Sequence, residues 1–278
     1  YFTFDDPVLR EAAKADPVGF VKRLPDKCTL DEIQFAPEIL GSLKQEVDRD
    51  RVPGRFILTG SAQVLMLPTV SESLAGRLSI VPLLPFGQTE IEQRKSKFLQ
   101  LAFSGDILDA TPKWKLEHIA ERVLRGGFPD AALKGNLAAA KRWQSNYVSA
   151  ILQKDIRELA RIDHAEVLPR LMRVLASRTA QLLSLNAMAG EFQLSRTTLD
   201  RYSGLLKQLF LIDTLPPWFT NATKQLTKTP KLHLVDSGLA AMLSKVELPI
   251  LAKGRKYYGQ LVESFVYGEL KKMMTWEG

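Results

Sequence analysis

Two adjacent carboxylates, Asp31 and Glu32, are the first residues of this chain whose types and spacing could do chemistry. They come directly after the short apolar segment Cys28–Leu30, where a strand would present them at its end. At such a position the first carboxylate can orient the water shell of a Mg²⁺ ion that bridges phosphates, and the second can polarise an attacking water. Adjacent carboxylates are also common in surface turns, so the pair alone leaves that structural interpretation open.

Two later features follow the carboxylates in an order that suits the same chemistry. Residues 55–60 read as a buried strand that leads into Ser61. If this strand runs parallel to and beside the first, the hydroxyl of Thr59 or Ser61 could contact a γ-phosphate or hold the attacking water. Arg77 stands at the end of the next helix, from which its guanidinium could reach the phosphate of a neighbouring subunit. Three elements in this order favour a nucleotide site over a surface turn.

Strands and helices alternate over the first part of the chain. Strands are expected at 1–6, 28–30, 55–60 and 78–83. Helices are expected to begin at the Asp-Pro pairs 6–7 and 16–17 and at Pro37, because Asp caps a helix and proline suits its first position. The alternation predicts an α/β domain with a parallel sheet. From about residue 89 the pattern is almost entirely helical, interrupted by the Gly-Gly-Phe-Pro bend at 126–129.

Residues 165–235 read as three helices followed by two strands. The helices are expected over 167–181, after a cap at Ser184 and after a cap at Ser195, and the strands at 211–215 and 231–235. This order is typical of a winged helix-turn-helix, whose third helix can lie in the major groove of DNA. The exposed, DNA-facing side of that helix would carry Arg196, Thr197, Asp200, Arg201 and Lys207, with Lys224, Lys228 and Lys231 near the wing. A structural lid or a subunit contact is the alternative role.

Composition narrows the class of protein. The net charge of +7 over 278 residues favours a polyanionic partner such as nucleic acid, although Lys and Arg also serve simply to solvate a surface. No apolar run of about 18 residues occurs, so no membrane-spanning helix is expected. The single cysteine, Cys28, excludes an internal disulfide and fits the reducing cytoplasm. The three histidines are far apart in sequence, so no zinc site is expected.

On these residues the chain resembles a prokaryotic AAA-type (P-loop) ATPase family that joins an ATPase domain, a winged helix and a C-terminal restriction-nuclease-like domain. The matching stretches are Leu30–Gln34 with Pro37-Glu38, Gly54–Ala62, Glu72–Arg77, Gly126–Pro129, Thr229–Lys231, Val235–Leu239, and Gly259 with Glu263 and Glu269-Leu270. They run through almost the full length of the chain in the order of the family.

The resemblance implies both a domain order and a set of roles. It implies a parallel-sheet P-loop ATPase domain over 1–88, truncated at its N-terminus and present from its Walker B segment onward. A helical lid or linker over 89–164, the winged helix over 165–235 and the start of an α/β nuclease-like domain over 236–278 would follow. The implied roles are Asp31 as Mg²⁺ ligand, Glu32 as general base, Thr59 or Ser61 as sensor and Arg77 as finger. ATP and Mg²⁺ would be the cofactors, and a homo-oligomer is left open. The glycine-rich phosphate loop is expected before Tyr1 and the rest of the nuclease-like domain after Gly278.

Two kinds of function therefore remain open. The first is a cytoplasmic, Mg²⁺-dependent ATPase that couples its nucleotide state to a winged helix placed on DNA. The second is a winged-helix DNA-binding regulator, or a nuclease-linked module, in which the ATPase part only senses nucleotide or is inactive.

Overall fold

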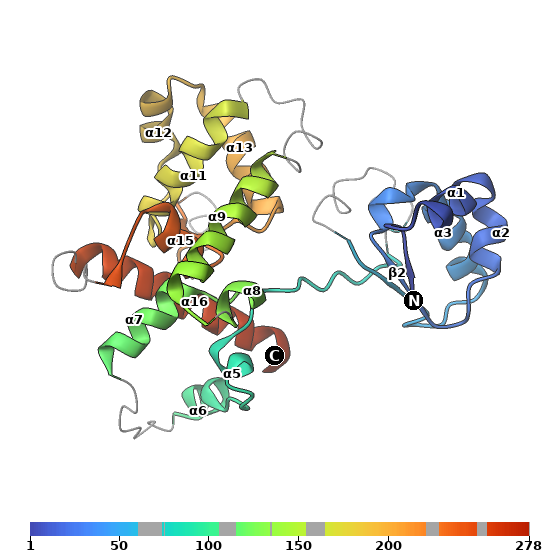
Figure 1. Ribbon diagram of the computed structural model, residues 1–278, viewed down its shortest axis with the longest axis horizontal. Coiled ribbons are helices and arrows are strands. Elements are labelled where there is room, and N and C mark those ends of the chain that lie inside the picture. Colours follow the sequence, from blue (N-terminus) through green and yellow to red (C-terminus); the bar gives the residue numbers. More distant parts are fainter. Residues whose placement is uncertain are drawn as a thin grey trace. The chain divides into compact units, whose positions relative to one another are not determined.

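The computed structural model describes residues 1–60, 74, 76–105, 115–133, 135–153, 165–220, 228–248 and 255–277. The chain forms two compact units, Tyr1–Pro82 and Leu83–Gly278, each with its own three-stranded sheet (Figure 1).

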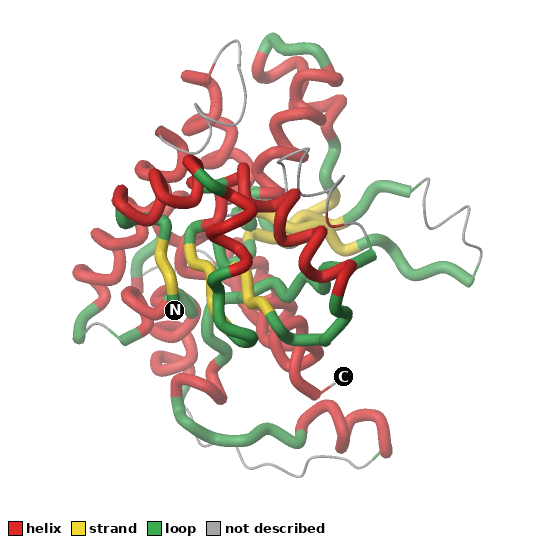
Figure 2. The backbone as a smooth tube through the Cα atoms, turned by 90° about the vertical axis from the view of Figure 1, so that its right-hand side faces the viewer, coloured by secondary structure: helices red, strands yellow, loops and turns green. Residues whose placement is uncertain are grey.

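The sheet of the first unit is parallel and has the strand order β1-β2-β3. Its strands are β1 at Phe2–Thr3, β2 at Cys28–Asp31 and β3 at Phe56–Leu58 (Figure 2). The register pairs Cys28 with Phe56 and Leu30 with Leu58, so these four side chains share one face of the sheet. The predicted parallel sheet is confirmed, and so is the prediction that the strand before Thr59 lies beside the strand that carries Asp31.

Three helices and two short turns accompany the sheet among the described residues of the first unit. The helices are α1 (Pro7–Ala15), α2 (Pro17–Lys22) and α3 (Leu40–Arg49), and 3₁₀ turns at Ile33–Phe35 and Pro37–Ile39 lead into α3. Asp6 accepts a hydrogen bond from the Val8 amide at 2.8 Å, and Asp16 accepts one from the Gly19 amide at 2.8 Å. Both helix starts are therefore capped as the sequence predicts. The helices bury a common core with the sheet, which includes Phe4, Phe20, Leu30, Ile39 and Leu43.

The strand expected at 78–83 does not form. Residues 78–83 have no regular secondary structure, and the side chains of Val81 and Leu83 are 83% and 99% exposed. β-branched and aliphatic residues favour a strand only where a neighbouring strand and a packing surface are present. Pro82 and Pro85 also lack the amide hydrogens that a central strand needs. The helix expected from Ser61 lies outside the described residues.

The second unit is mainly helical. Its helices are α5 (Gln88–Ile91), α6 (Phe98–Ser104), α7 (Leu116–Arg125), α8 (Pro129–Ala132), α9 (Leu137–Gln153), α11 (Leu168–Ser177), α12 (Leu185–Phe192), α13 (Arg196–Gln208), α15 (Ser237–Leu243) and α16 (Arg255–Glu277), with a 3₁₀ turn at Ala165–Val167. The short helix α15 contacts α7, α9, α11 and α16, and its residues Leu239 and Ala240 are fully buried. It forms the centre of this unit. The predicted division of the unit into a helical region, a winged helix and a nuclease-like region stays a prediction.

A small antiparallel sheet with the order β4-β6-β5 lies within the second unit. Its strands are β4 (Gln181–Leu182), β5 (Ile212–Leu215) and β6 (Lys231–Leu234). The chain runs α11, β4, α12, α13, β5, β6. Ser184 caps α12 and Ser195 caps α13 through hydrogen bonds to backbone amides, as the sequence predicts. The buried face of α13 carries Leu199, Tyr202 and Leu206.

The Gly-Gly bend joins α7 to α8 and receives a buried carboxylate. Gly126 has φ 72°, and a side chain there would meet the Asp236 carboxylate at 2.2 Å, so the position requires glycine. Asp236 accepts hydrogen bonds from the amides of Gly127 at 2.7 Å and Leu239 at 3.0 Å. Burial raises the pKa of Asp236 above its ordinary value. The bend expected at 126–129 is confirmed, and Asp236 caps the start of α15.

Candidate nucleotide site

The carboxyl edge of the first sheet brings one carboxylate and one hydroxyl into direct contact. Asp31 is the last residue of β2, and Thr59 follows the end of β3. The Thr59 amide donates to the Leu30 carbonyl at 2.9 Å, which continues the strand pairing one step beyond Leu58. The Thr59 hydroxyl then donates to the Asp31 carboxylate. Two positions 28 residues apart in sequence thus form one polar site at the strand ends.

Asp31 is held in its ionised form by these hydrogen bonds. Its other carboxylate oxygen accepts a hydrogen bond from the Tyr1 hydroxyl at 2.5 Å. The hydrogen bonds from Thr59 and then Tyr1 lower the pKa of Asp31 below its ordinary value. An ionised carboxylate next to a hydroxyl is an oxygen donor set of the kind that Mg²⁺ and its water shell prefer. The residues present therefore fit a magnesium ion. The contact of Tyr1 with Asp31 is one that sequence reasoning missed, since nothing in the residue types signals it.

Glu32 takes a strained backbone conformation next to Asp31. Its φ of 55° and ψ of 45° are in the left-handed region, which is uncommon for residues other than glycine. Its carboxylate accepts a hydrogen bond from the side-chain amide of Gln34, and its backbone carbonyl accepts one from the backbone amide of Phe35 at 3.0 Å. Strain of this kind is concentrated at functional sites and persists where the surrounding structure enforces it. The half-buried Glu32 is thus held beside Asp31 by the turn that ends β2.

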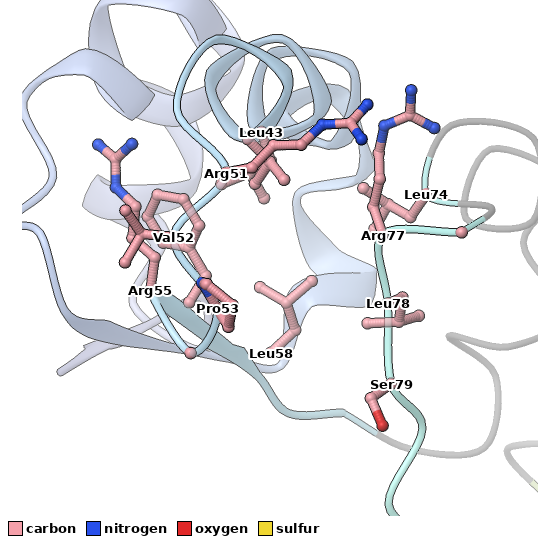
Figure 3. Close-up of a pocket in the computed structure, with 14 residues that line it drawn as sticks. Leu43, Arg51, Val52, Pro53, Arg55, Leu58, Leu74, Arg77, Leu78 and Ser79 are labelled. Carbon is pink, nitrogen blue, oxygen red and sulfur yellow. The ribbon is translucent and has the colours of Figure 1, made fainter.

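Arg77 lies in a different place from the carboxylate and hydroxyl. Its Nε and Nη2 donate to the two carboxylate oxygens of Asp48 at 2.6 and 2.9 Å, a bidentate pair that also lowers the pKa of Asp48. Arg77 lines a largely apolar cavity of about 430 Å³ whose walls include Leu43, Leu58 and Leu78 but none of Asp31, Glu32 or Thr59 (Figure 3). Figure 3 shows its side chain extending to the same rim as that of Arg51. The sequence did not signal Asp48 as its partner.

The four predicted site residues that the structure describes in this unit thus divide into two groups. Asp31, Glu32 and Thr59 stand together at the carboxyl edge of the sheet, and Arg77 is paired with Asp48 at the end of α3. Ser61, the other hydroxyl predicted for this edge, lies outside the described residues.

The residues predicted for the DNA-facing side of the third helix all lie on α13, and some of them line a cleft. Of the lysines predicted near the wing, Lys224 lies outside the described residues. Arg196 and Lys207 line a cleft beside the β5–β6 strands, and Lys207 donates to the Thr214 hydroxyl at 2.7 Å. Thr197 and Arg201 are exposed and are not part of the walls of that cleft. The Arg201 guanidinium instead lies over the Tyr202 ring, 5.5 Å from its centre.

Among the described residues, no helix has the length and apolar character needed to cross a bilayer. No group of three or more His, Cys, Asp or Glu side chains in the described ranges is arranged to hold a metal ion by itself. A magnesium ion at Asp31 would accordingly need oxygen ligands from phosphates and water.

A parallel sheet whose neighbouring strands end in a paired carboxylate and hydroxyl is the kind of edge at which open α/β domains bind their ligands. Residues 1–92 match the family described as an AAA domain, which supports the class of AAA-type, nucleotide-binding ATPases for the first unit. Residues 116–249 match a domain of unknown function (DUF8612).

Two curated relatives match nearly the whole chain. They are the uncharacterized proteins Rv2008c of Mycobacterium tuberculosis and Mb2031c of Mycobacterium bovis, each 27% identical over 274 residues. The match covers 98% of this chain but 57% of each relative, so the chain spans little more than half of their length. A solved structure, the Walker-type ATPase PABY2304 of Pyrococcus abyssi, aligns with 77% of this chain and 62% of its own, at 21% identity and a TM-score of 0.45.

Proposed function

We propose that this chain is part of a Mg²⁺-dependent AAA-type ATPase whose nucleotide state controls a winged helix that contacts DNA. The observation that carries the ATPase part is the contact between Asp31 and Thr59 at the ends of neighbouring parallel strands. The match of residues 1–92 to an AAA domain supports the same class.

Each residue at the sheet edge has a proposed role. Asp31, kept ionised by its hydrogen bonds, orients the water shell of Mg²⁺. When bound, Mg²⁺ and ATP supply the activated γ-phosphate and offset part of its charge. Glu32 acts as general base on the attacking water, and the Thr59 hydroxyl, with Ser61 as the alternative, senses the γ-phosphate.

Arg77 is proposed as a finger that acts on the nucleotide of a neighbouring subunit in a homo-oligomer. In the structure its guanidinium is held by Asp48, so this role requires that the bidentate pair opens when a phosphate competes for the guanidinium. Arginine suits such an exchange because carboxylate and phosphate both accept its paired hydrogen bonds.

Residues 165–235 are proposed to form the winged helix. What supports this is the order α11, β4, α12, α13, β5, β6 together with the antiparallel sheet order β4-β6-β5. In this arrangement α13 would be the helix presented to DNA. A nuclease-like region over 236–278 remains a proposal from the resemblance alone.

The decisive experiment is ATP turnover by the full-length protein and its Glu32→Gln variant, with and without DNA. Loss of a general base lowers the rate about 10²–10⁴-fold, so we expect turnover to fall by at least about 100-fold while ATP binding persists. The matched control is Glu38→Gln, which removes an exposed carboxylate six positions along the chain and should leave turnover unchanged. Equal turnover by Glu32→Gln and the wild type would remove the ATPase proposal.

A DNA-binding regulator with a silent ATPase part is the second candidate, favoured by the independent core and sheet of the second unit. For that candidate the full-length protein would bind DNA without measurable ATP turnover. Cleavage of plasmid DNA in Mg²⁺ would instead indicate the nuclease-linked form.

A further inference from the structure

A cleft lies between the start of α12, one face of α13 and the β5–β6 strands. Its volume is about 480 Å³, and its walls include the segments 183–186 and 228–230. For comparison, one water occupies about 30 Å³ of the liquid. The cleft therefore has room for a ligand much larger than a bound water.

The charged side chains that line the cleft are mostly cations. Arg196, Lys207 and Lys228 line the cleft together with one carboxylate, that of Asp200, which leaves a net charge of +2 from three positive charges and one negative. Lys207 donates to the neutral Thr214 hydroxyl. Within the described part of the chain, neither Arg196 nor Lys228 forms an ion pair with a carboxylate. An excess of positive charge around a concave surface raises the local concentration of anions.

The spacing of the cations favours an extended anion. Arg196 and Lys207 are eleven residues apart on α13, which corresponds to about 16 Å along the helix axis. A strand of DNA offers a phosphate about every 3.4 Å of its axis, so each cation can meet its own phosphate. A single phosphate group would require both side chains to bend towards each other. The length of the charged wall therefore fits a nucleic-acid backbone.

Gly204 leaves the wall of the cleft open in the interior of α13. Glycine in a helix interior costs roughly 0.5–1 kcal/mol relative to alanine. Packing does not require it here, because an added Cβ would meet nothing within 4 Å. The open space beside this exposed glycine is explained if a ligand approaches the helix backbone here.

We propose that this cleft binds phosphate groups of the backbone of duplex DNA. The proposal rests on, and deepens, the DNA contact proposed for residues 165–235. Arg196 and Lys207 then bind phosphates rather than base edges, Lys228 joins them, and Thr197 and Arg201 lie outside this contact.

The test is the affinity of the full-length protein for a short labelled DNA duplex, measured by fluorescence anisotropy over a range of salt concentrations. Removing one cation that binds a phosphate should weaken binding about fivefold at 0.15 M salt and reduce the slope of log K against log[salt] by about 0.9. Lys207→Gln and Lys228→Gln should each show this change. Lys95→Gln, an exposed lysine of the same unit away from the cleft, is the charge control and should show a smaller one.

A second pair of variants tests the space rather than the charge. Gly204→Gln should fill the cleft and weaken DNA binding at least fivefold, although Gln is a better helix former than Gly. Gly190→Gln makes the same change in α12, at an exposed helical glycine that also has open space, and should leave binding intact. Thermal unfolding of both variants establishes that each is folded.

The outcomes separate this inference from the proposed function. If DNA binds but Lys207→Gln, Lys228→Gln and Gly204→Gln behave like their controls, the cleft proposal is wrong and the DNA contact lies elsewhere. If the wild type binds no DNA, both proposals are wrong, whereas ATP turnover still tests the ATPase part alone. Polyglutamate and inorganic phosphate are added as competitors at the same concentration of negative charge as unlabelled DNA. If either displaces the labelled duplex as effectively as unlabelled DNA does, the assignment to DNA is overturned.

Discussion

Glu32 combines a proposed catalytic role with a backbone conformation that its side chain disfavours. A left-handed conformation costs an L-residue roughly 1–2 kcal/mol, whereas glycine adopts it freely. Glu32→Gly should therefore change the free energy of unfolding by between zero and about +1 kcal/mol, after the added entropy of the unfolded chain is subtracted. ATP turnover should nevertheless be abolished, because the carboxylate is gone. Urea unfolding and a turnover assay on the same preparation measure both effects.

Gln193 provides the matched control for this substitution. It has φ 54°, almost the same as Glu32, and it is exposed at the end of α12. Gln193→Gly should give a comparable or larger stabilisation with unchanged turnover. Retained turnover in Glu32→Gly would refute the general-base role. A loss of stability in Glu32→Gly that Gln193→Gly does not share would assign Glu32 a structural role instead.

At the scale of whole elements, polar contacts to α16 hold strands β5 and β6 in place. His233 is 1% exposed, its Nδ1 lies 3.0 Å from the Ser264 hydroxyl, and its ring stacks on Tyr267 at 4.2 Å between centres. The Tyr267 hydroxyl donates to Asp213 at 2.7 Å, and Lys271 forms an ion pair with the same carboxylate. The strands that border the cleft are thus fixed from behind by one long helix.

This arrangement predicts a pH dependence of stability that belongs to His233. Burial lowers its pKa below the ordinary value of 6.5, with smaller effects from Glu263, Lys231 and Asp213. The unfolded chain then binds the proton more readily than the folded chain. The contribution of neutral His233 to the free energy of unfolding is therefore complete above about pH 6.5 and is lost as pH falls below it. One such group changes the free energy of unfolding by at most about 1.4 kcal/mol per pH unit. Chemical unfolding at pH 7.5 and 5.5 should show a larger loss in wild type than in His233→Gln.

Asp213 cannot produce this effect, because it titrates in a different window. Burial raises the pKa of Asp213, but the hydrogen bonds from Lys271 and Tyr267 outweigh it, and the net pKa is lowered. The contribution of ionised Asp213 to the free energy of unfolding is therefore present above the ordinary carboxyl range near pH 4 and is lost only below it. Equal losses by wild type and His233→Gln between pH 7.5 and 5.5 would show that His233 is not the titrating group.

Local signals in the sequence predicted the elements well, whereas partners distant in sequence could not be predicted. Asp6, Ser184 and Ser195 cap helices through amides two or three residues away, and such a signal is visible in the residue types themselves. The contact of Asp31 with Thr59 was predictable because the ends of neighbouring parallel strands meet at one edge. A strand at 78–83 was predicted from residue type alone, and it fails because a strand also needs a neighbour.

Ion pairs are the part of the site that depends most on tertiary structure. Asp48 is one of several charged residues along α3, and only its position in the fold makes it the partner of Arg77. The cleft of the second unit is similar, because Lys228 and Arg196 approach it from segments 32 residues apart (228 − 196). Sequence alone identified the cations on α13 but not which of them line the cleft with Lys228.

At the scale of the whole molecule, the proposed ATPase and DNA contacts belong to two compact units, and the relatives are considerably longer than this chain. A machine that couples the two sites must show linkage between them. If ATP changes the affinity for DNA by some factor, DNA must change the affinity for ATP by the same factor, and such factors are typically about 5–150. If the ATPase part binds nucleotide without any linkage to DNA binding, ATP leaves the affinity for DNA unchanged and DNA leaves the affinity for ATP unchanged.

The Glu32→Gln variant makes this linkage measurable, because it is expected to hold ATP without hydrolysing it. We expect its DNA affinity with and without ATP, and its ATP affinity with and without DNA, to change by one common factor within about 5–150. Lys228→Gln should weaken DNA binding in both nucleotide states about equally, since it removes one phosphate contact and leaves the coupling intact. Fluorescence anisotropy for DNA and calorimetry for ATP provide the four constants. Identical DNA affinities in the presence and absence of bound ATP would contradict the coupled ATPase and leave the regulator as the function that fits.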